Sequence, residues 1–136
     1  MPKEHINPTT LFPSVPLGFS QIVATQGGKT VYVSGQTAWD AGKQIIGGMD
    51  LGEQTRQALR NIRIAVEAAG GNMADVVSVR IYVVNYKRKD AAAVGQAFNE
   101  FFPGDHPPAS TLIGVSSLAV EDFLIEIEAI AVIESA

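Results

Sequence analysis

The stretch from Phe123 to Ile133 constrains the fold more than any other, because it is apolar on both faces that a β-strand presents. Side chains alternate between the two faces of a strand. One face carries only aliphatic residues, which are Ile125, Ile127, Ala129, Ala131 and Ile133. The other face carries two carboxylates, Glu126 and Glu128, among Leu124, Ile130 and Val132. We therefore expect a strand whose aliphatic face packs on helices and whose other face holds two carboxylates in apolar surroundings.

The remaining chain contains four further strand-like runs and two helical patterns. The runs lie at about 21–25, 30–34, 75–84 and 110–115, and the Gly27-Gly28 pair between the first two predicts a hairpin. Asp50 with Glu53 resembles a capping box, and Gly70-Gly71 ends the long amphipathic helix that follows. Asp90 begins a second, shorter helix that Pro103-Gly104 ends.

These elements follow the order β-β-α-β-α-β-β. Runs of strands joined by two helices predict an α+β fold, with a mixed sheet covered by both helices on one face. Residues 1–18 contain several prolines and predict an irregular N-terminal arm, and the 136 residues fit one domain. The second face of the sheet then has no cover within the chain, so we expect it to meet another copy.

Composition supports that expectation and excludes several classes of function. Charged residues make up 18% of the chain, against about 25% in an average soluble domain, so part of the surface can be hidden between copies. A net charge of −4 without a basic cluster disfavours nucleic-acid binding. The chain has no cysteine and only two histidines, so we expect no metal site. Without an apolar leader or spanning segment, we expect a soluble cytoplasmic protein and no membrane partner.

Glu126 and Glu128 are the first candidates for chemistry, because a carboxylate in apolar surroundings must be paired or open to a cleft. Alternation in the strand at 75–84 places Arg80 on the same face as these carboxylates. A structural pair between Arg80 and Glu128 is the simpler interpretation, and a ligand-binding Arg80 is the alternative. His106 lies in a proline-rich loop, where a histidine is usually only solvated.

Four segments resemble the Rid family, also called YjgF or L-PSP endoribonuclease-like proteins. They are Val31-Tyr-Val-Ser-Gly-Gln36, Gln57-Ala-Leu-Arg-Asn-Ile62 with Val66-Glu-Ala-Ala-Gly70, Pro108-Ala109, and Ile125-Glu-Ile-Glu-Ala-Ile-Ala131. The resemblance implies a chorismate-mutase-like fold and a homotrimer whose sheets form a central barrel, with ligand clefts between subunits. It also implies cofactor-free hydrolysis of reactive enamines and imines, like that of 2-iminobutanoate/2-iminopropanoate deaminase. By resemblance, Glu126 positions the catalytic water, and the cleft is lined by Phe19, Ser34, Gly35, Tyr86, Ser110 and Thr111.

Three cleft positions depart from the family pattern. Ser110 stands where the family has the arginine that binds the substrate carboxylate, Leu112 replaces a frequent cysteine, and Phe19 replaces a tyrosine. We therefore expect a deaminase of a different, less acidic imine, or a substitute cation from Arg80, Lys87 or Arg88. The alternative is a non-catalytic, small-molecule-binding homotrimer with a regulatory or chaperone-like role. Endoribonuclease activity ranks last, because the acidic chain lacks a basic patch.

Overall fold

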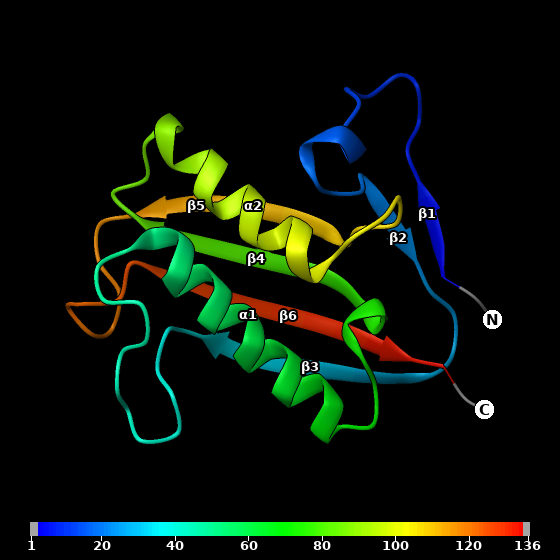
Figure 1. Ribbon diagram of the computed structural model, residues 1–136. Coiled ribbons are helices and arrows are strands. Elements are labelled where there is room, and N and C mark those ends of the chain that lie inside the picture. The colour runs from blue at the N-terminus through cyan, green and yellow to red at the C-terminus, as the bar shows by residue number, and fades with distance from the viewer. Residues whose placement is uncertain (1–2, 135–136) are drawn as a thin grey trace.

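A computed structural model describes residues 3–134, which form a four-stranded mixed sheet, a separate two-stranded sheet and two helices (Figure 1). The large sheet has the order β3-β6-β4-β5, in which β6 is antiparallel to both neighbours and β4 is parallel to β5. The elements are β1 (Glu4–Ile6), β2 (Ile22–Ala24), β3 (Lys29–Gln36), α1 (Leu51–Ala68), β4 (Val76–Val84), α2 (Ala91–Phe101), β5 (Ala109–Val115) and β6 (Ile125–Ile133). Three short 3₁₀ turns lie at Val15–Leu17, Met73–Asp75 and Arg88–Asp90.

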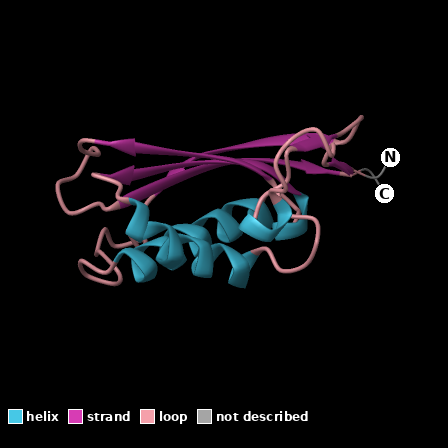
Figure 2. Ribbon diagram, turned by 90° about the horizontal axis from the view of Figure 1, so that it is seen from above, coloured by secondary structure: helices cyan, strands magenta, loops and turns pink. Residues whose placement is uncertain are grey.

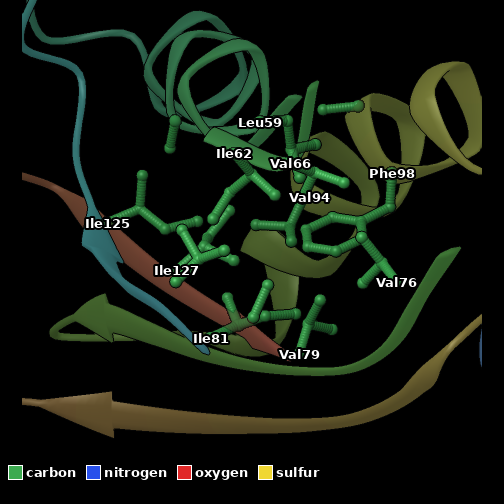
Figure 3. Packing of buried hydrophobic residues seen from close by; sticks show 14 of the residues in the cluster. Leu59, Ile62, Val66, Val76, Val79, Ile81, Val94, Phe98, Ile125 and Ile127 are labelled. Carbon is green, nitrogen blue, oxygen red and sulfur yellow. The ribbon is translucent and has the colours of Figure 1, made fainter. Parts of the chain in front are cut away.

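Both helices cover the same face of the large sheet, as predicted, and no other element of residues 3–134 forms a layer over the opposite face (Figure 2). Between helices and sheet, Leu59 and Ile62 of α1 meet Ile125 and Ile127 of β6, and all four side chains are fully buried (Figure 3). The aliphatic face of β6 thus packs on the helices. The face of β6 that carries Glu126 and Glu128 points away from the helices.

Local sequence explains why α1 begins and ends where it does. The Asp50 side chain accepts a hydrogen bond from the Glu53 backbone N–H at 2.9 Å, which satisfies one of the free N–H groups of the first turn. Gly70 follows the helix with a φ of 99°, a left-handed conformation that glycine adopts without strain. Both predicted signals therefore act as expected.

The predicted hairpin between 21–25 and 30–34 is wrong. The two glycines do turn the chain, with φ values of 69° at Gly27 and 78° at Gly28. However, β2 pairs with β1, whereas β3 pairs with β6. Ser20, just before β2, forms an isolated parallel β-bridge with Ala109 of β5. The chain therefore enters β2 at the β5 edge of the large sheet, whereas β3 forms the opposite edge. The nine-residue β6 offers β3 a much longer ladder than three-residue β2 could.

The N-terminal arm is more regular than predicted. Its residues Glu4–Ile6 form β1, antiparallel to β2, and a 3₁₀ turn occupies Val15–Leu17, while residues 1 and 2 lie outside the described range. The observed order therefore has one more strand than the predicted order, placed before the other elements. Ser20 fastens the arm to the loop before β5, because its hydroxyl donates to the Pro107 carbonyl and its N–H to that of Pro108.

Asp90 also acts differently from the prediction. It occupies the residue before α2, but its carboxylate accepts from the Lys87 backbone N–H at 2.8 Å and makes no side-chain cap to α2. The reason is the 3₁₀ turn at Arg88–Asp90, which runs directly into the helix and presents a nearer backbone donor.

Candidate functional site

Glu126 and Glu128 lie on the face of the sheet that the helices leave uncovered. In the register of β4 with β6, Tyr82 stands opposite Glu126 and Arg80 stands opposite Glu128. The inward neighbours Ile125 and Ile127 are fully buried, whereas both glutamates are half-buried. Alternation along β6 therefore gives one core face and one face that carries both carboxylates, as the sequence predicts.

Glu128 is held by two neighbours on β4. The Tyr82 hydroxyl donates a short hydrogen bond to Glu128 Oε1, and Arg80 Nη1 lies 4.0 Å from the same oxygen. The hydrogen bond to this carboxylate, together with burial and the charge of Glu128, raises the pKa of Tyr82 above its usual value. The Arg80 side chain is 59% exposed, so its contact with Glu128 is at the outer limit of an ion pair and weak. The structure thus places Arg80 and Glu128 together.

Glu126 is in a different position, because none of the side-chain hydrogen bonds or ion pairs found within residues 3–134 involves its carboxylate. It packs instead against Gly35. A Cβ atom at position 35 would lie 2.8 Å from Glu126 Cδ and 2.9 Å from Cγ, which is closer than carbon atoms approach. Glycine at position 35 therefore leaves the space that the Glu126 side chain occupies.

An irregularity in β3 brings Gly35 to this place. Val33 pairs with Ala129 and Gln36 with Ile127, so Ser34 and Gly35 together oppose the single residue Glu128. Such a bulge leaves one residue outside the regular ladder and bends the strand. Both bulged residues are exposed, and Gly35 lies directly beside the Glu126 carboxylate.

Phe19 and Ser110 lie elsewhere, in a cavity of about 340 Å³ on the helix side of the sheet. Its walls come from the N-terminal arm, the sheet and α2, and they are formed by Leu17, Gly18, Phe19, Ile81, Ala91, Val94, Gly95, Phe98, Ser110 and Leu112. Ser110 is the neighbour of the buried Val79 on β4, which sets its side chain toward the helix layer. The predicted site residues therefore form two groups on opposite faces of the sheet.

Two further predicted residues lie outside the cavity lining. Thr111 is the β5 neighbour of Arg80 and is exposed on the uncovered face. Tyr86 packs beside Gly114, where an added Cβ would come within 3.1 Å of the Tyr86 Cβ. The substitute cations are also absent from the lining, since Arg80 stands beside Glu128 and neither Lys87 nor Arg88 contributes to the cavity wall.

The two histidines contact each other rather than a candidate site residue. The His5 and His106 rings meet edge to face with centroids 4.8 Å apart, which joins β1 to the loop before β5. Burial, followed by the nearby His106 and Lys3, lowers the pKa of His5. Nowhere in residues 3–134 do three or more histidine, aspartate or glutamate side chains gather so that they could hold a metal ion.

Sequence reasoning missed two sets of residues that shape the site. On α2, Ala91, Val94, Gly95 and Phe98 follow the spacing of one helical face, but that pattern does not distinguish a filled core from a cavity wall. On α1, the fully buried Gln54 side chain donates hydrogen bonds to the carbonyls of Gly48 and Asp122 and accepts one from the Leu124 N–H. It thereby holds Leu124, the residue just before β6 and two residues before Glu126.

Comparison with known proteins gives consistent matches over the length of the chain. The family model described as Endoribonuclease L-PSP matches residues 12–133. A 2-iminobutanoate/2-iminopropanoate deaminase from Dermatophagoides farinae is 37% identical over 135 residues, covering 98% of this chain and 100% of the relative. Within residues 3–134, no helix is both long and apolar enough to cross a membrane, and the cytoplasmic location stays a prediction.

Solved structures agree with the sequence matches. YyfB of the Rid protein family, from Yersinia pestis, superposes with a TM-score of 0.93 at 44% identity, covering 98% of this chain and 100% of that one. RidA from an Antarctic Psychrobacter species superposes with a TM-score of 0.69 at 31% identity, covering 84% and 87%. With sequence, family model and fold in agreement, the chain belongs to the Rid family, also known as the YjgF or L-PSP endoribonuclease-like family.

Proposed function

We propose that the protein hydrolyses a small reactive imine or enamine to the corresponding carbonyl compound and ammonia. The observation that carries the proposal is the Glu126 carboxylate, which is half-buried, held against Gly35 and without a side-chain partner among residues 3–134. The similar protein from Dermatophagoides farinae is a 2-iminobutanoate/2-iminopropanoate deaminase, and this likeness supports the same class of reaction for the present chain.

The chemistry requires a base beside a bound water molecule. As the water oxygen bonds to the imine carbon, a Glu126 oxygen takes a proton from the water, and solvent protonates the imine nitrogen. In the resulting carbinolamine, the proton held by Glu126 passes to the amino nitrogen and the C–N bond breaks to release ammonia. The hydroxyl loses its proton to solvent as the C=O bond forms, which leaves Glu126 as a carboxylate again. An enamine enters the same sequence after protonation at carbon. The exposed backbone of Ser34 and Gly35 is suited to orient the substrate by hydrogen bonds.

The placement of the two groups of predicted residues supports a site shared between copies. Within one chain, Glu126 faces away from the helices while Ser110 faces them, and β4 separates their strands, whose axes are therefore about 10 Å apart. One small substrate cannot easily meet both in the same chain. In a homotrimer with clefts between subunits, Glu126 of one copy can face the cavity of the next.

The surface of the isolated chain also favours assembly. Its accessible area is 7814 Å², against roughly 6,800 Å² expected for a folded monomer of this mass. Tyr32 is 78% exposed and Ile113 is 42% exposed. Tyr32 pairs with Ile130 and Ile113 pairs with Tyr82, which places both side chains on the uncovered face. A sheet face that exposes large apolar side chains is typical of an interface. We therefore assign this face to contacts between three copies.

The test uses imines generated in place from amino acids, including the enamine 2-aminoacrylate and its imine tautomer, with release of ammonia and keto acid as the readout. We expect the wild-type protein to accelerate release, and Glu126→Ala to lose about 10²- to 10⁴-fold in rate, the usual contribution of a general base. Ser110→Arg should increase activity on substrates that carry a carboxylate, because guanidinium binds carboxylate in two hydrogen bonds.

Each competing interpretation has its own outcome in the same experiment. Equal rates for wild type and Glu126→Ala would remove Glu126 from the mechanism. No acceleration by any variant over a panel of imines would favour the non-catalytic binding protein, an alternative that the missing arginine at position 110 keeps open.

A further inference from the structure

The cavity beside α2 has a lining that is almost entirely apolar. Seven of its ten wall residues have apolar side chains, two are glycines, and Ser110 supplies the one polar side chain. Among residues 3–134, no charged side chain contributes to the wall. An unpaired carboxylate moved into such surroundings loses its hydration without gaining a counter-ion. The cavity therefore disfavours an anionic group.

The same cavity is suited to an apolar group. Phe19 in the lining meets Phe12 edge to face with ring centroids 6.0 Å apart, and Leu17, also in the lining, is 68% exposed. Phe98, Val94 and Ile81 line the cavity and also belong to the hydrophobic core (Figure 3). A dry cavity of about 150 Å³ is large enough to bind benzene. At about 340 Å³, this one has room for a phenyl ring or a branched alkyl chain.

The arm holds this wall in a defined position. Gly18 has a φ of 99° and ends the 3₁₀ turn, with its N–H bonded to the Val15 carbonyl at 2.9 Å. Just after it, Ser20 is bonded to the loop before β5, the strand that carries Ser110. Phe19 is therefore fixed between two anchored residues, and the cavity exists before any ligand arrives.

We propose that this cavity binds an uncharged aliphatic or aryl substituent of the substrate, with the Ser110 hydroxyl as its single side-chain hydrogen-bond partner. The proposal rests on the proposed function and names its substrate class, which is imines that carry an apolar group and no carboxylate beside the C=N bond. Phe19, Ser110 and Leu112, the three positions that depart from the family pattern, all line this cavity.

A binding experiment tests the pocket without relying on activity. The two probes are phenylacetamide, which is neutral, and phenylacetate, which has almost the same shape and a negative charge, and binding is measured by calorimetry and by NMR shifts of the protein. We expect phenylacetamide to bind at least ten times more tightly than phenylacetate, with shifts at Val94, Ser110 and Leu112. Equal affinity, tighter binding of phenylacetate, or no binding of either probe would overturn the proposal.

Gly95 offers a variant that fills the cavity while preserving the helix. A Cβ at this position meets nothing within 4 Å, so Gly95→Leu places a side chain in open space. Gln96→Leu is the matched control, because Gln96 is exposed on the same helix and outside the lining. We expect Gly95→Leu to weaken phenylacetamide at least tenfold and Gln96→Leu to leave its affinity unchanged. Unchanged affinity in Gly95→Leu would place the probe elsewhere and contradict the proposal.

A second measurement separates this proposal from the proposed function. Imines are generated by an amine oxidase from 2-phenylethylamine, which lacks a carboxylate, and by an amino acid oxidase from phenylalanine. We expect kcat/KM to be at least tenfold higher for the neutral imine, and Ser110→Arg to reverse the preference. Turnover of both at equal rates would overturn the pocket assignment and leave hydrolysis standing. Selective binding of phenylacetamide without turnover of either imine would support the pocket assignment and overturn the proposed hydrolysis.

Discussion

At the scale of single residues, Gly35 has the clearest functional consequence. Its missing side chain leaves room for the Glu126 carboxylate, and the atoms that an added Cβ would displace all belong to the Glu126 side chain, which can move. Gly35→Ala should therefore fold normally and misplace Glu126. We expect kcat/KM to fall at least tenfold, equal to about 1.4 kcal/mol of transition-state stabilisation.

The control for Gly35→Ala is Gly42→Ala, in the loop that follows β3. A Cβ at Gly42 meets only Asp40 Oδ1, at an ordinary distance of 3.5 Å. Steady-state rates and thermal midpoints are measured for both variants. Full activity in Gly35→Ala would show that the carboxylate does not need its present position.

Tyr82 gives a prediction about alkaline pH. Because the hydrogen bond to Glu128 raises its pKa in the folded protein, the unfolded chain loses this proton first as the pH rises. The contribution to stability is complete below pH 10, the usual pKa of tyrosine, and disappears as the pH passes the raised value. We expect Tyr82→Phe to show a smaller fall in thermal midpoint between pH 9 and 11 than the wild type does.

Absorbance at the tyrosinate band checks the same residue directly. The chain has three tyrosines, and Tyr82→Phe should remove a component that titrates above the usual pKa of tyrosine. Tyr32→Phe serves as the control, because Tyr32 is 78% exposed. If a component raised above the usual pKa of tyrosine remains unchanged in Tyr82→Phe, it does not belong to Tyr82 and the hydrogen bond to Glu128 is not formed in solution.

At the scale of elements, the buried Gln54 joins α1 to the start of β6. Gln54→Leu leaves the carbonyls of Gly48 and Asp122 and the N–H of Leu124 without this partner. Each buried polar group left unpaired costs about 1–3 kcal/mol. We expect the free energy of unfolding to fall by about 3 kcal/mol.

The measurement is denaturant unfolding at one fixed protein concentration, since assembly makes apparent stability depend on concentration. Gln96→Leu makes the same substitution at an exposed helical position and should change stability by less than about 0.5 kcal/mol. Equal stability of the two variants would mean that Gln54 does not fasten β6.

Comparison of elements also shows which parts of the fold the sequence predicts. The alternation of β6 and the Asp50 cap of α1 are local signals, and the structure confirms both. The hairpin prediction failed because a turn fixes where the chain reverses but not which strands pair. In the structure β3 pairs with β6, and β2 pairs with β1. Local sequence signals therefore determine where helices and strands form. Which strands pair is determined by competition between strands that are distant in the sequence.

The candidate site divides in the same way. Alternation alone places Glu126, Arg80 and Glu128 on one face. Residue spacing alone does not predict the cavity, because Phe19, Gly95 and Ser110 come from an arm, a helix and a strand that meet only in the folded chain. The family resemblance placed Phe19 and Ser110 in one cleft but gave no indication of Gly95. A helical stripe containing Val94 and Phe98 looks the same whether the space beside it is filled or empty.

At the scale of the whole molecule, the central claim is that one reaction site is divided between neighbouring copies. The claim predicts that two variants with different defects restore each other, because a mixed trimer contains clefts in which the intact Glu126 of one copy meets the intact cavity of another. Glu126→Gln and Gly95→Leu are the two variants, each expected to be nearly inactive when pure.

The measurement is the rate of ammonia release by the co-expressed pair, with tags that confirm mixed assembly. Random mixing of two variants around a closed ring of three should restore about one quarter of the wild-type rate. Co-purifying mixed trimers whose rate is no higher than that of the pure variants would contradict the account.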